Sequence, residues 1–490
     1  MTRGLLSASG GILSAAAVGL FLLLIVLAPL PMGGNRDWAW SPMVVVVGGM
    51  SMLFAAGIGT RGGFEVSAEE RGPLMVLLAA FTFFFLESLL QMSTLAPTTP
   101  SAWLYERARA ILGKAHDPVP TLAIDASRNV LLKSMACGLL FLTARALFVD
   151  PRRARWLLGA LALSALLVMT YALISQVSTN SCLVGSFLKK QGEYTVGYRC
   201  LMSGTFVNSN SFACFMGMGL VAVLALLLGH QPPRRRRHHD DGDEDFGGEE
   251  SVLDRITGPR VALLALGFLF LGGLLISGSR AGLAASVLGI LILLSLFMRG
   301  RWASRSQMGR ALLIGGAVVV VIGIIAGGAM LQKLARFSEG SSTNRIYIWE
   351  STLEAIAQSP WWGWGRGAYP DIYSILQPLE IPQPNDLAHS TPLETIVELG
   401  IPGAVVAFLI VLVPWGVCLL GGLRSERERL LPATAFALTS VPILHSSVDF
   451  SLQMPAIAFV SSAVLGMGWA QVFARRAESS SERHRGPHDE

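Results

Sequence analysis

Long apolar runs constrain this chain more than any other feature. Between its polar segments, small and branched apolar residues continue for roughly 18 to 25 positions, the length that crosses a bilayer as a helix. Of the 490 residues, 52% are hydrophobic and only 14% are charged, against about 25% charged in average soluble domains. The sequence therefore predicts an all-α polytopic integral membrane protein and excludes an ordinary soluble globular protein.

The apolar runs predict about twelve transmembrane helices in a single integral membrane domain over residues 1–490. We place these spans at residues 11–30, 42–58, 73–91, 129–148, 156–176, 210–229, 260–277, 281–298, 311–330, 393–420, 431–446 and 455–473. The first run is too long and too lightly charged for a cleaved signal peptide, so we expect it to be retained. An even number of spans places both termini on the same side of the membrane.

The distribution of Arg and Lys predicts the orientation. With a cytoplasmic N-terminus, most of the 38 basic residues fall on the cytoplasmic side, as the positive-inside rule requires. The formal net charge of +5 then reports orientation, and it gives no reason to expect a nucleic-acid partner. The outer side carries three long loops, at residues 92–128, 177–209 and 331–392.

Two polar segments are expected on the cytoplasmic side. Residues 230–259 hold four consecutive arginines followed by acidic residues and predict a disordered loop, and residues 474–490 form a tail. On the outer side, Cys182 and Cys200 bracket a polar loop, where an oxidising compartment would favour a disulfide over two free thiols. No zinc-like spacing occurs, so we expect neither a metal nor another cofactor.

Ionisable residues at span ends are functional candidates, because charge is costly in hydrocarbon. Arg280 lies between two apolar runs with almost no loop, and its planar fork of donors suits phosphate oxygens. Arg345 follows the ninth span and shares a helix face with Trp349, four residues on. The two arginines could clamp a diphosphate; alternatively, Arg280 snorkels in a tight hairpin and Arg345 with Trp349 anchors the interface.

Two further groups carry polar chemistry. His389 precedes a helix start initiated by proline, where a neutral imidazole could accept a proton from a hydroxyl; a lone histidine is also often structural. Asn208 and Asn210 open the sixth span, and His445 and Asp449 close the eleventh. These side chains could bind sugar hydroxyls or satisfy one another between helices.

The segment 360–367 is aromatic and rich in turn residues, and it contains Arg366. Indole faces suit the headgroup belt and also the apolar faces of sugar rings, and we favour the belt. We count Arg366 among the candidates for substrate binding.

Taken in order, these stretches resemble the O-antigen ligase and polymerase family of bacterial envelope glycosyltransferases. The resemblance is carried by Gly204 to Phe206 with Asn208 and Asn210, Ser277 to Gly282, Arg345 with Trp349, Pro360 to Gly367, His389, and Glu398 to Gly403. The core of the resemblance covers about residues 200–425. Residues 445–455 resemble a further motif of exopolysaccharide polymerases in the same family.

This resemblance implies a GT-C-like membrane glycosyltransferase of the bacterial inner membrane, with periplasmic outer loops. The implied donor is a glycan on undecaprenyl diphosphate, and the acceptor is a glycan or lipid A core. By resemblance, Arg280 and Arg345 bind the diphosphate and His389 activates the acceptor hydroxyl for one inverting displacement, without a metal or nucleotide. A flippase and a chain-length regulator are the implied protein partners.

Several functions share this donor chemistry. We favour polymerisation of O-antigen or exopolysaccharide repeat units, because residues 445–455 resemble polymerases and the loop at 92–128 could hold a growing chain. Transfer to lipid A core by a ligase and transfer to protein stay open. A transporter of lipid-linked glycan is the alternative from another class, since twelve helices suit many carriers, although polar clusters gathered on one side favour an enzyme.

Overall fold

A computed structural model describes residues 2–59, 66–95, 102–113, 119–179, 202–230, 258–299, 345–379, 381, 384–424 and 429–484. These residues form helices joined by turns and loops, and they contain no strand. Within them, nine helices are long and apolar enough to cross a membrane. The prediction of an all-α polytopic membrane protein is confirmed.

The observed helices coincide with the apolar runs. The nine helices that meet this criterion are α2 (Asp37–Gly59), α3 (Ala68–Gln91), α5 (Ile124–Leu147), α6 (Pro151–Thr179), α8 (Ser209–Gly229), α9 (Gly258–Ile276), α10 (Arg280–Met298), α13 (Thr391–Gly422) and α15 (Pro455–His484). Two further helices contain shorter apolar stretches, namely α1 (Thr2–Leu27) and α14 (Leu430–His445). The predicted ninth span, residues 311–330, lies outside the described residues, and every other predicted span overlaps one of these helices.

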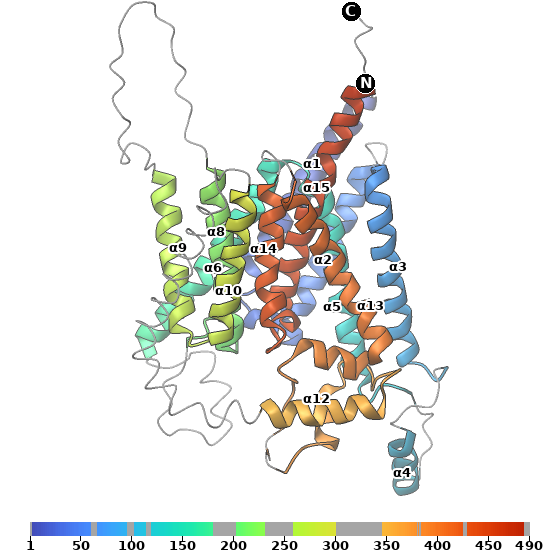
Figure 1. The fold of residues 1–490 in the computed structure, drawn as a ribbon. Coiled ribbons are helices and arrows are strands. Elements are labelled where there is room, and N and C mark those ends of the chain that lie inside the picture. The colour runs from blue at the N-terminus through green and yellow to red at the C-terminus, as the bar shows by residue number, and fades with distance from the viewer. Residues whose placement is uncertain are drawn as a thin grey trace, which may run out of the picture.

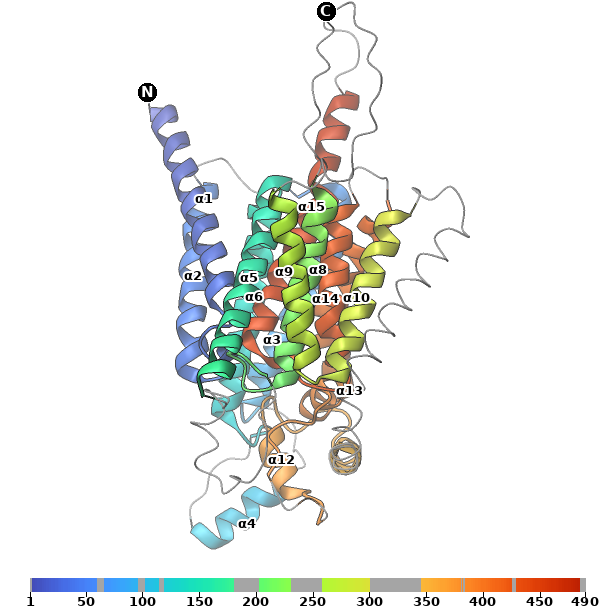
Figure 2. The same ribbon diagram turned by 90° about the vertical axis from the view of Figure 1, so that its left-hand side faces the viewer.

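The helices run side by side and give the bundle two distinct ends. Helix α1 begins and α15 ends at the same end of the bundle, which we call the terminal end (Figures 1 and 2). At the opposite end, which we call the loop end, α8, α10 and α13 begin and α9 and α14 finish. The two chain ends therefore share one side, as an even number of spans predicts.

Helix α15 lies at the centre of the bundle. Its span Pro455–Phe473 is 89% buried, whereas Gly258–Ile276 of the peripheral helix α9 is only 17% buried. Helix α15 packs against α5 and α14, and Trp469 donates its indole N–H to Glu70 of α3 at 2.6 Å. Glu70 also receives two donors from the buried guanidinium of Arg145 on α5. A buried, bidentate ion pair thus joins three helices near the terminal end.

The predicted outer loops contain helices of their own. The loop at 92–128 carries α4 (Ala102–Leu112), and the loop at 331–392 carries a helix over residues 345–358 and α12 (Tyr369–Ile375). These helices lie at the loop end, below the bundle in Figure 1. At the terminal end, α15 continues to His484, so the predicted tail is helical over its first part.

Helix α13 is kinked at Gly400, whose φ of 69° is left-handed. The segment 360–367 runs along this kink: the amide of Trp364 donates to the carbonyl of Val397 at 2.9 Å, and the amide of Ile401 donates to the carbonyl of Pro360 at 2.7 Å. A Cβ at position 400 would lie 2.5 Å from the Trp361 carbonyl oxygen, so only glycine allows this approach.

Some expectations fall where the structure gives no description. The central part of the segment 230–259 and both Cys182 and Cys200 lie outside the described residues.

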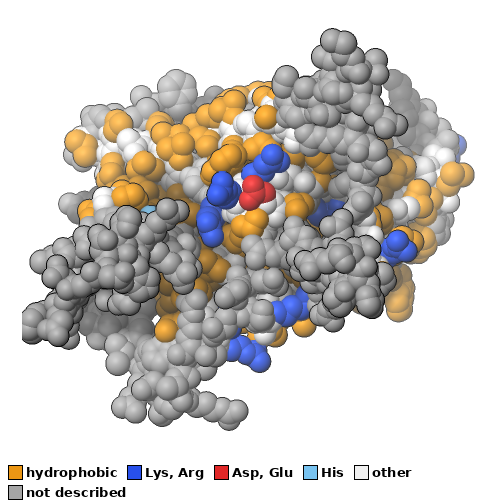
Figure 3. All heavy atoms as spheres, turned by 90° about the horizontal axis from the view of Figure 1, so that it is seen from above, with side chains coloured by type: hydrophobic (Ala, Val, Ile, Leu, Met, Phe, Trp, Pro, Cys, Tyr) orange, Lys and Arg blue, Asp and Glu red, His pale blue; other side chains and the backbone are white. Residues whose placement is uncertain are grey.

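At the terminal end, Figure 3 shows Lys and Arg side chains more often than acidic ones among the described side chains of that face. The described basic residues near this end include Arg152, Arg155, Arg260 and Arg299.

Candidate functional site

The polar residues singled out in the sequence lie at the loop end. Asn208 and Asn210 are at the start of α8, Arg280 begins α10, and His389 precedes α13. His445 ends α14, and Asp449 lies in the turn between α14 and α15. Segments that are distant in the sequence therefore converge on one end of the bundle.

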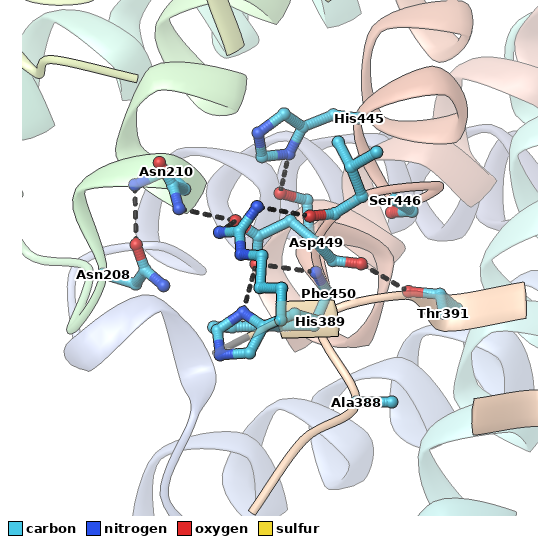
Figure 4. A network of polar contacts seen from close by, with 12 residues as sticks. Asn208, Asn210, Ala388, His389, Thr391, His445, Ser446, Asp449 and Phe450 are labelled. Atoms are coloured by element: carbon cyan, nitrogen blue, oxygen red, sulfur yellow. Dashed lines mark hydrogen bonds and ion pairs between the residues drawn. The ribbon is translucent and has the colours of Figure 1, made fainter. Parts of the chain in front are cut away.

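Asp449 is the centre of this convergence, and it is only 1% exposed (Figure 4). Its Oδ2 accepts a hydrogen bond from Nδ2 of Asn210 at 2.6 Å and lies 3.7 Å from Nη2 of Arg345. Its Oδ1 accepts the amide N–H of Phe450 at 2.9 Å and lies 3.5 Å from Nδ1 of His389. One carboxylate thus faces donors from four segments of the chain.

The surroundings of Asp449 favour its charged form. Burial alone would raise the pKa of this carboxyl group, but contact with His389 and the nearby charges of His445 and Arg345 outweigh it. The pKa of Asp449 therefore lies below its ordinary range. At neutral pH the Asp449 carboxylate therefore gives the site a negative charge.

The starts and ends of two helices hold this arrangement. Asn208 caps α8, because its Oδ1 accepts the amide N–H of Asn210 at 2.7 Å. At the end of α14, Nδ1 of His445 and Oγ of Ser451 are 2.6 Å apart. The bond from Asn210 to Asp449 joins α8 to the turn after α14, which is one of the two alternatives that the sequence left open. Asn210 bonds Asp449 directly, whereas Asn208 contributes through the cap.

His389 meets Asp449 from the other side of the site. Its side chain is 26% exposed, yet Nδ1 is buried, so the accessible part of the ring is elsewhere. The ring centroid lies 5.2 Å from that of Phe450. Because the two ring nitrogens have different surroundings, Nδ1 faces the carboxylate and Nε2 is the nitrogen that is left for a substrate.

Arg345 and Trp349 both reach this site from the helix over residues 345–358. Nη1 of Arg345 donates to the carbonyl of Val448 at 3.0 Å, next to Asp449. One turn further along, Nε1 of Trp349 donates to the carbonyl of Ala388 at 3.0 Å. The shared helix face that the spacing predicts therefore points at the Asp449 turn and at the His389 segment together.

Arg280 stands at the start of α10 and is exposed. Its side chain makes no hydrogen bond or ion pair with any residue that the structure describes. Close packing brings the start of α10 against that of α8: a Cβ at Gly282 would lie 2.7 Å from the Cβ of Ala213, one turn beyond Asn210. The start of α10, which carries Arg280, therefore packs beside the start of α8, from which Asn210 reaches Asp449.

Arg366 belongs to a separate cluster. Its Cζ lies 4.1 Å from the ring centroid of Phe84, and its backbone N–H donates to Oε1 of Gln91 at 3.2 Å. Burial lowers the pKa of the Arg366 guanidinium to about 10, and the carboxylates of Glu398 and Glu87 oppose this. The structure does not join Arg366 to Asp449 by any described contact.

The aromatic segment around Arg366 divides into two parts. Trp361 is 67% exposed, as a residue of the headgroup belt would be. Trp364 is buried, and its indole N–H donates to the carbonyl of Ala355 at 2.9 Å. One tryptophan thus fits the belt, while the other fixes the fold of the outer helices.

A cavity of about 480 Å³ lies at the terminal end, between α6, α8, α9 and α14. Arg155 and His230 line it together with leucines. None of the candidate residues named above lines it, so it is separate from the polar network. Within the described part of the chain, no three His, Cys, Asp or Glu side chains are grouped to hold a metal ion.

Sequence reasoning did not identify Glu394 or Thr391 as part of this site. Oε2 of Glu394 accepts the amide N–H of Ala388 at 2.8 Å, and the amide of Thr391 donates to the carbonyls of Ser446 at 2.9 Å and Asp449 at 3.2 Å. These contacts act through the backbone. The one available signal was a glutamate five residues after His389 on a membrane helix, where charge needs a reason.

Comparison with known proteins adds a family to this geometry. Residues 265–408 match the family model described as O-antigen ligase. No curated protein matches the chain significantly. The matched segment includes Arg280, Arg345, Arg366 and His389, while Asn210 and Asp449 lie outside it. The match confirms the resemblance seen in the sequence: residues 265–408 of this multi-pass membrane protein are similar to the O-antigen ligase family.

Proposed function

We propose that this protein transfers a glycan from undecaprenyl diphosphate to a sugar hydroxyl at the periplasmic face of the bacterial inner membrane. The observation that carries the proposal is the Asp449 carboxylate, which faces His389 on one oxygen and Arg345 on the other. A base and a cation are thereby held at one end of a membrane bundle. The family match supports a glycan-ligating or polymerising activity.

The proposed orientation places the loop end in the periplasm. Basic side chains predominate on the described face of the terminal end, which the positive-inside rule assigns to the cytoplasm. Both termini are then cytoplasmic. The lipid tail of the donor would reach the site from the bilayer, while its glycan stays in the aqueous phase at the loop end.

In the proposed reaction, His389 takes the proton of the acceptor hydroxyl through Nε2. The hydroxyl oxygen forms a bond to the anomeric carbon while the bond from that carbon to the diphosphate oxygen breaks, which inverts the configuration. The bonding electrons leave with the diphosphate, whose growing charge Arg280 and Arg345 stabilise. Asp449 stabilises the imidazolium that forms, as a carboxylate beside a histidine base does in other enzymes.

The remaining candidates take supporting roles in this proposal. Asn210 fixes Asp449, Asn208 fixes the start of α8, and His445 fixes the turn through Ser451. Arg366 stabilises the loop that braces the α13 kink. Direct contact with the glycan by these side chains is a second possibility that the same variants test.

Polymerisation of repeat units is the activity we propose first, on the resemblance of residues 445–455 to exopolysaccharide polymerases. Transfer of finished O-antigen to lipid A core is the second candidate, and the description of the matched family as O-antigen ligase favours it. Both reactions use the same donor and the same base. They differ in the acceptor alone.

The test is to reconstitute the purified protein with lipid-linked repeat units, with and without lipid A core, and to separate the products by size. Ladders of glycan without core would support the polymerase. Product that forms only with core would support the ligase. If no undecaprenyl diphosphate is released under either condition, transfer is excluded, and transport of the lipid-linked glycan becomes the better explanation.

A further inference from the structure

We infer that Glu394 and Trp349 are positioning residues for His389, and that they act by holding the Ala388 peptide from its two sides. Neither residue touches the reacting groups. The inference deepens the proposed function and rests on it where it concerns turnover. Its structural part, the restraint of the Ala388 backbone, can be measured without any activity.

The contacts are specific and buried. Oε2 of Glu394 accepts the Ala388 N–H at 2.8 Å, and Glu394 is only 6% exposed. Nε1 of Trp349 donates to the Ala388 carbonyl at 3.0 Å. Ala388 itself is fully buried. Both polar groups of the residue before His389 therefore bond side chains, one from α13 and one from the helix over residues 345–358.

His389 needs this restraint because its backbone is left-handed. Its φ is 51°, and among the described residues Met32 is the one other non-glycine residue with a positive φ. A residue with a Cβ is unfavourable in this conformation and persists there only when its surroundings fix it. Relaxation to an ordinary φ would swing the imidazole away from Asp449.

The residues after His389 are fixed in the same way. The Thr391 amide donates to the carbonyls of Ser446 and Asp449, and its Oγ1 donates to the Asp449 carbonyl at 3.3 Å. His389 therefore lies between a restraint on Ala388 and a restraint on Thr391. The restraint on Thr391 joins the histidine segment to the backbone of the turn that carries the Asp449 carboxylate. The restraint on Ala388 sets the direction in which the His389 ring leaves the backbone.

Trp349 also couples the position of His389 to that of Arg345. Trp349 is four residues after Arg345 on one helix, so a shift of that helix would move the donor to Ala388 and the guanidinium beside Asp449 together. The helix over residues 345–358 thus positions the cation directly and the proposed base through Trp349. A residue that only filled space in the core would give no such coupling.

The first experiment measures the restraint itself. Hydrogen exchange of the Ala388 amide in the detergent-solubilised full chain should be at least about ten-fold faster in Glu394→Ala than in wild type. Glu394→Gln should stay close to wild type, because its amide oxygen can still accept the bond. Equal exchange in wild type and Glu394→Ala would overturn the inference.

The second experiment measures turnover of the lipid-linked donor. Glu394→Ala and Trp349→Phe should each lower kcat by about ten-fold, the loss expected for one displaced hydrogen bond at the base, with KM for the donor within about two-fold of wild type. Glu394→Gln should restore most of the rate. Trp349→Phe keeps the inference testable if Glu394→Ala does not fold.

Matched controls are available at the same end of the bundle. Glu350→Ala changes an exposed glutamate beside Trp349, and Trp38→Phe changes a tryptophan that is 64% exposed; both should keep the wild-type kcat. If wild type transfers glycan and His389→Ala does not, but Glu394→Ala and Trp349→Phe turn over at the wild-type rate, the positioning inference fails alone. If wild type releases no undecaprenyl diphosphate, the proposed function fails.

Discussion

Replacing Asp449 by asparagine is the most direct test of the network. The substitution preserves size and removes the negative charge to which His389 and Arg345 are held at 3.5 and 3.7 Å. It also removes one acceptor oxygen. Both carboxylate oxygens face donors, so an asparagine in either orientation turns its NH₂ group toward N–H groups of the protein.

The expected magnitude follows from the distance to His389. At an effective dielectric constant of about 20, Coulomb's law gives roughly 5 kcal/mol between a carboxylate and an imidazolium that are 3.5 Å apart. The histidine side chain is 26% exposed, and solvent screening reduces this to about 2–3 kcal/mol. Since each 1.36 kcal/mol corresponds to about ten-fold in rate, kcat should fall by about 100-fold.

The assay is release of undecaprenyl diphosphate from a lipid-linked repeat unit in proteoliposomes, with protein content matched by quantitative size exclusion. Asp386→Asn is the control and should keep the wild-type rate, because Asp386 is an exposed aspartate of the segment that precedes His389. An Asp449→Asn protein that folds and has a kcat within about three-fold of the wild-type value would refute this role of the Asp449 charge.

Three other predictions concern stability. Arg366→Met should lower the free energy of unfolding by about 3–5 kcal/mol, because Glu87 and Glu398 lose their buried cation and must take up protons or stay charged without a partner. Thermal unfolding in detergent should show a clear fall in Tm, whereas Arg128→Met, at an exposed pair, should show almost none. Gly363→Ala should also lower Tm, because φ of Gly363 is 66° and a Cβ there would overlap the backbone carbonyl of Glu398. The control Gly159→Ala adds a Cβ in open space and should not lower Tm. Equal Tm values for the two variants would contradict this prediction. The pKa of Asp449 lies below its ordinary 3.8, so its contribution to stability is complete above that value and is lost as the pH falls through the folded-state pKa. The Tm difference between wild type and Asp449→Asn should therefore stay constant from about pH 7 to 5, and a difference that shrinks over this window would count against a depressed pKa.

The membrane helices could be predicted because one physical requirement dominates them. Each helix must present an apolar surface over about the thickness of the hydrocarbon core. Most residues of the run must therefore be apolar, and this can be seen directly in the sequence. The pairing of α8 with the end of α14 was also within reach. Polar residues at Asn210 and Asp449 interrupt two apolar runs at matching depths, and the structure joins them at 2.6 Å.

The course of the outer segments could not be predicted in this way. The kink of α13 depends on backbone hydrogen bonds between Val397 and Trp364 and between Pro360 and Ile401. Backbone bonds between distant segments leave no periodic trace in the sequence. Their one visible signature is glycine at positions where two chains touch, such as Gly363 and Gly400, and this reads from the sequence only as a turn.

The details of the site escaped prediction for a related reason. The sequence places His389 before a helix start, but it does not show the left-handed backbone of His389 or the bonds from Glu394 and Trp349 to the neighbouring Ala388. The surroundings of Arg366 could not be predicted either. Substrate binding by this arginine stays a prediction, and its described neighbours are Phe84, Gln91 and two glutamates, close to the kink of α13.

The segment that matches the O-antigen ligase family is smaller than the unit that builds the site. Residues 265–408 supply the histidine and the arginines, but the carboxylate that faces His389 and Arg345 comes from the turn after α14, and its strongest partner comes from α8. The matched segment alone would therefore hold the proposed base without the carboxylate that faces it. Because α8, α14 and α15 are also among the most buried helices that the structure describes, Asp449 and Asn210 are anchored to the core of the bundle. Changes that loosen the packing of α8 against α14 should then reduce turnover even where they lie far from the loop end.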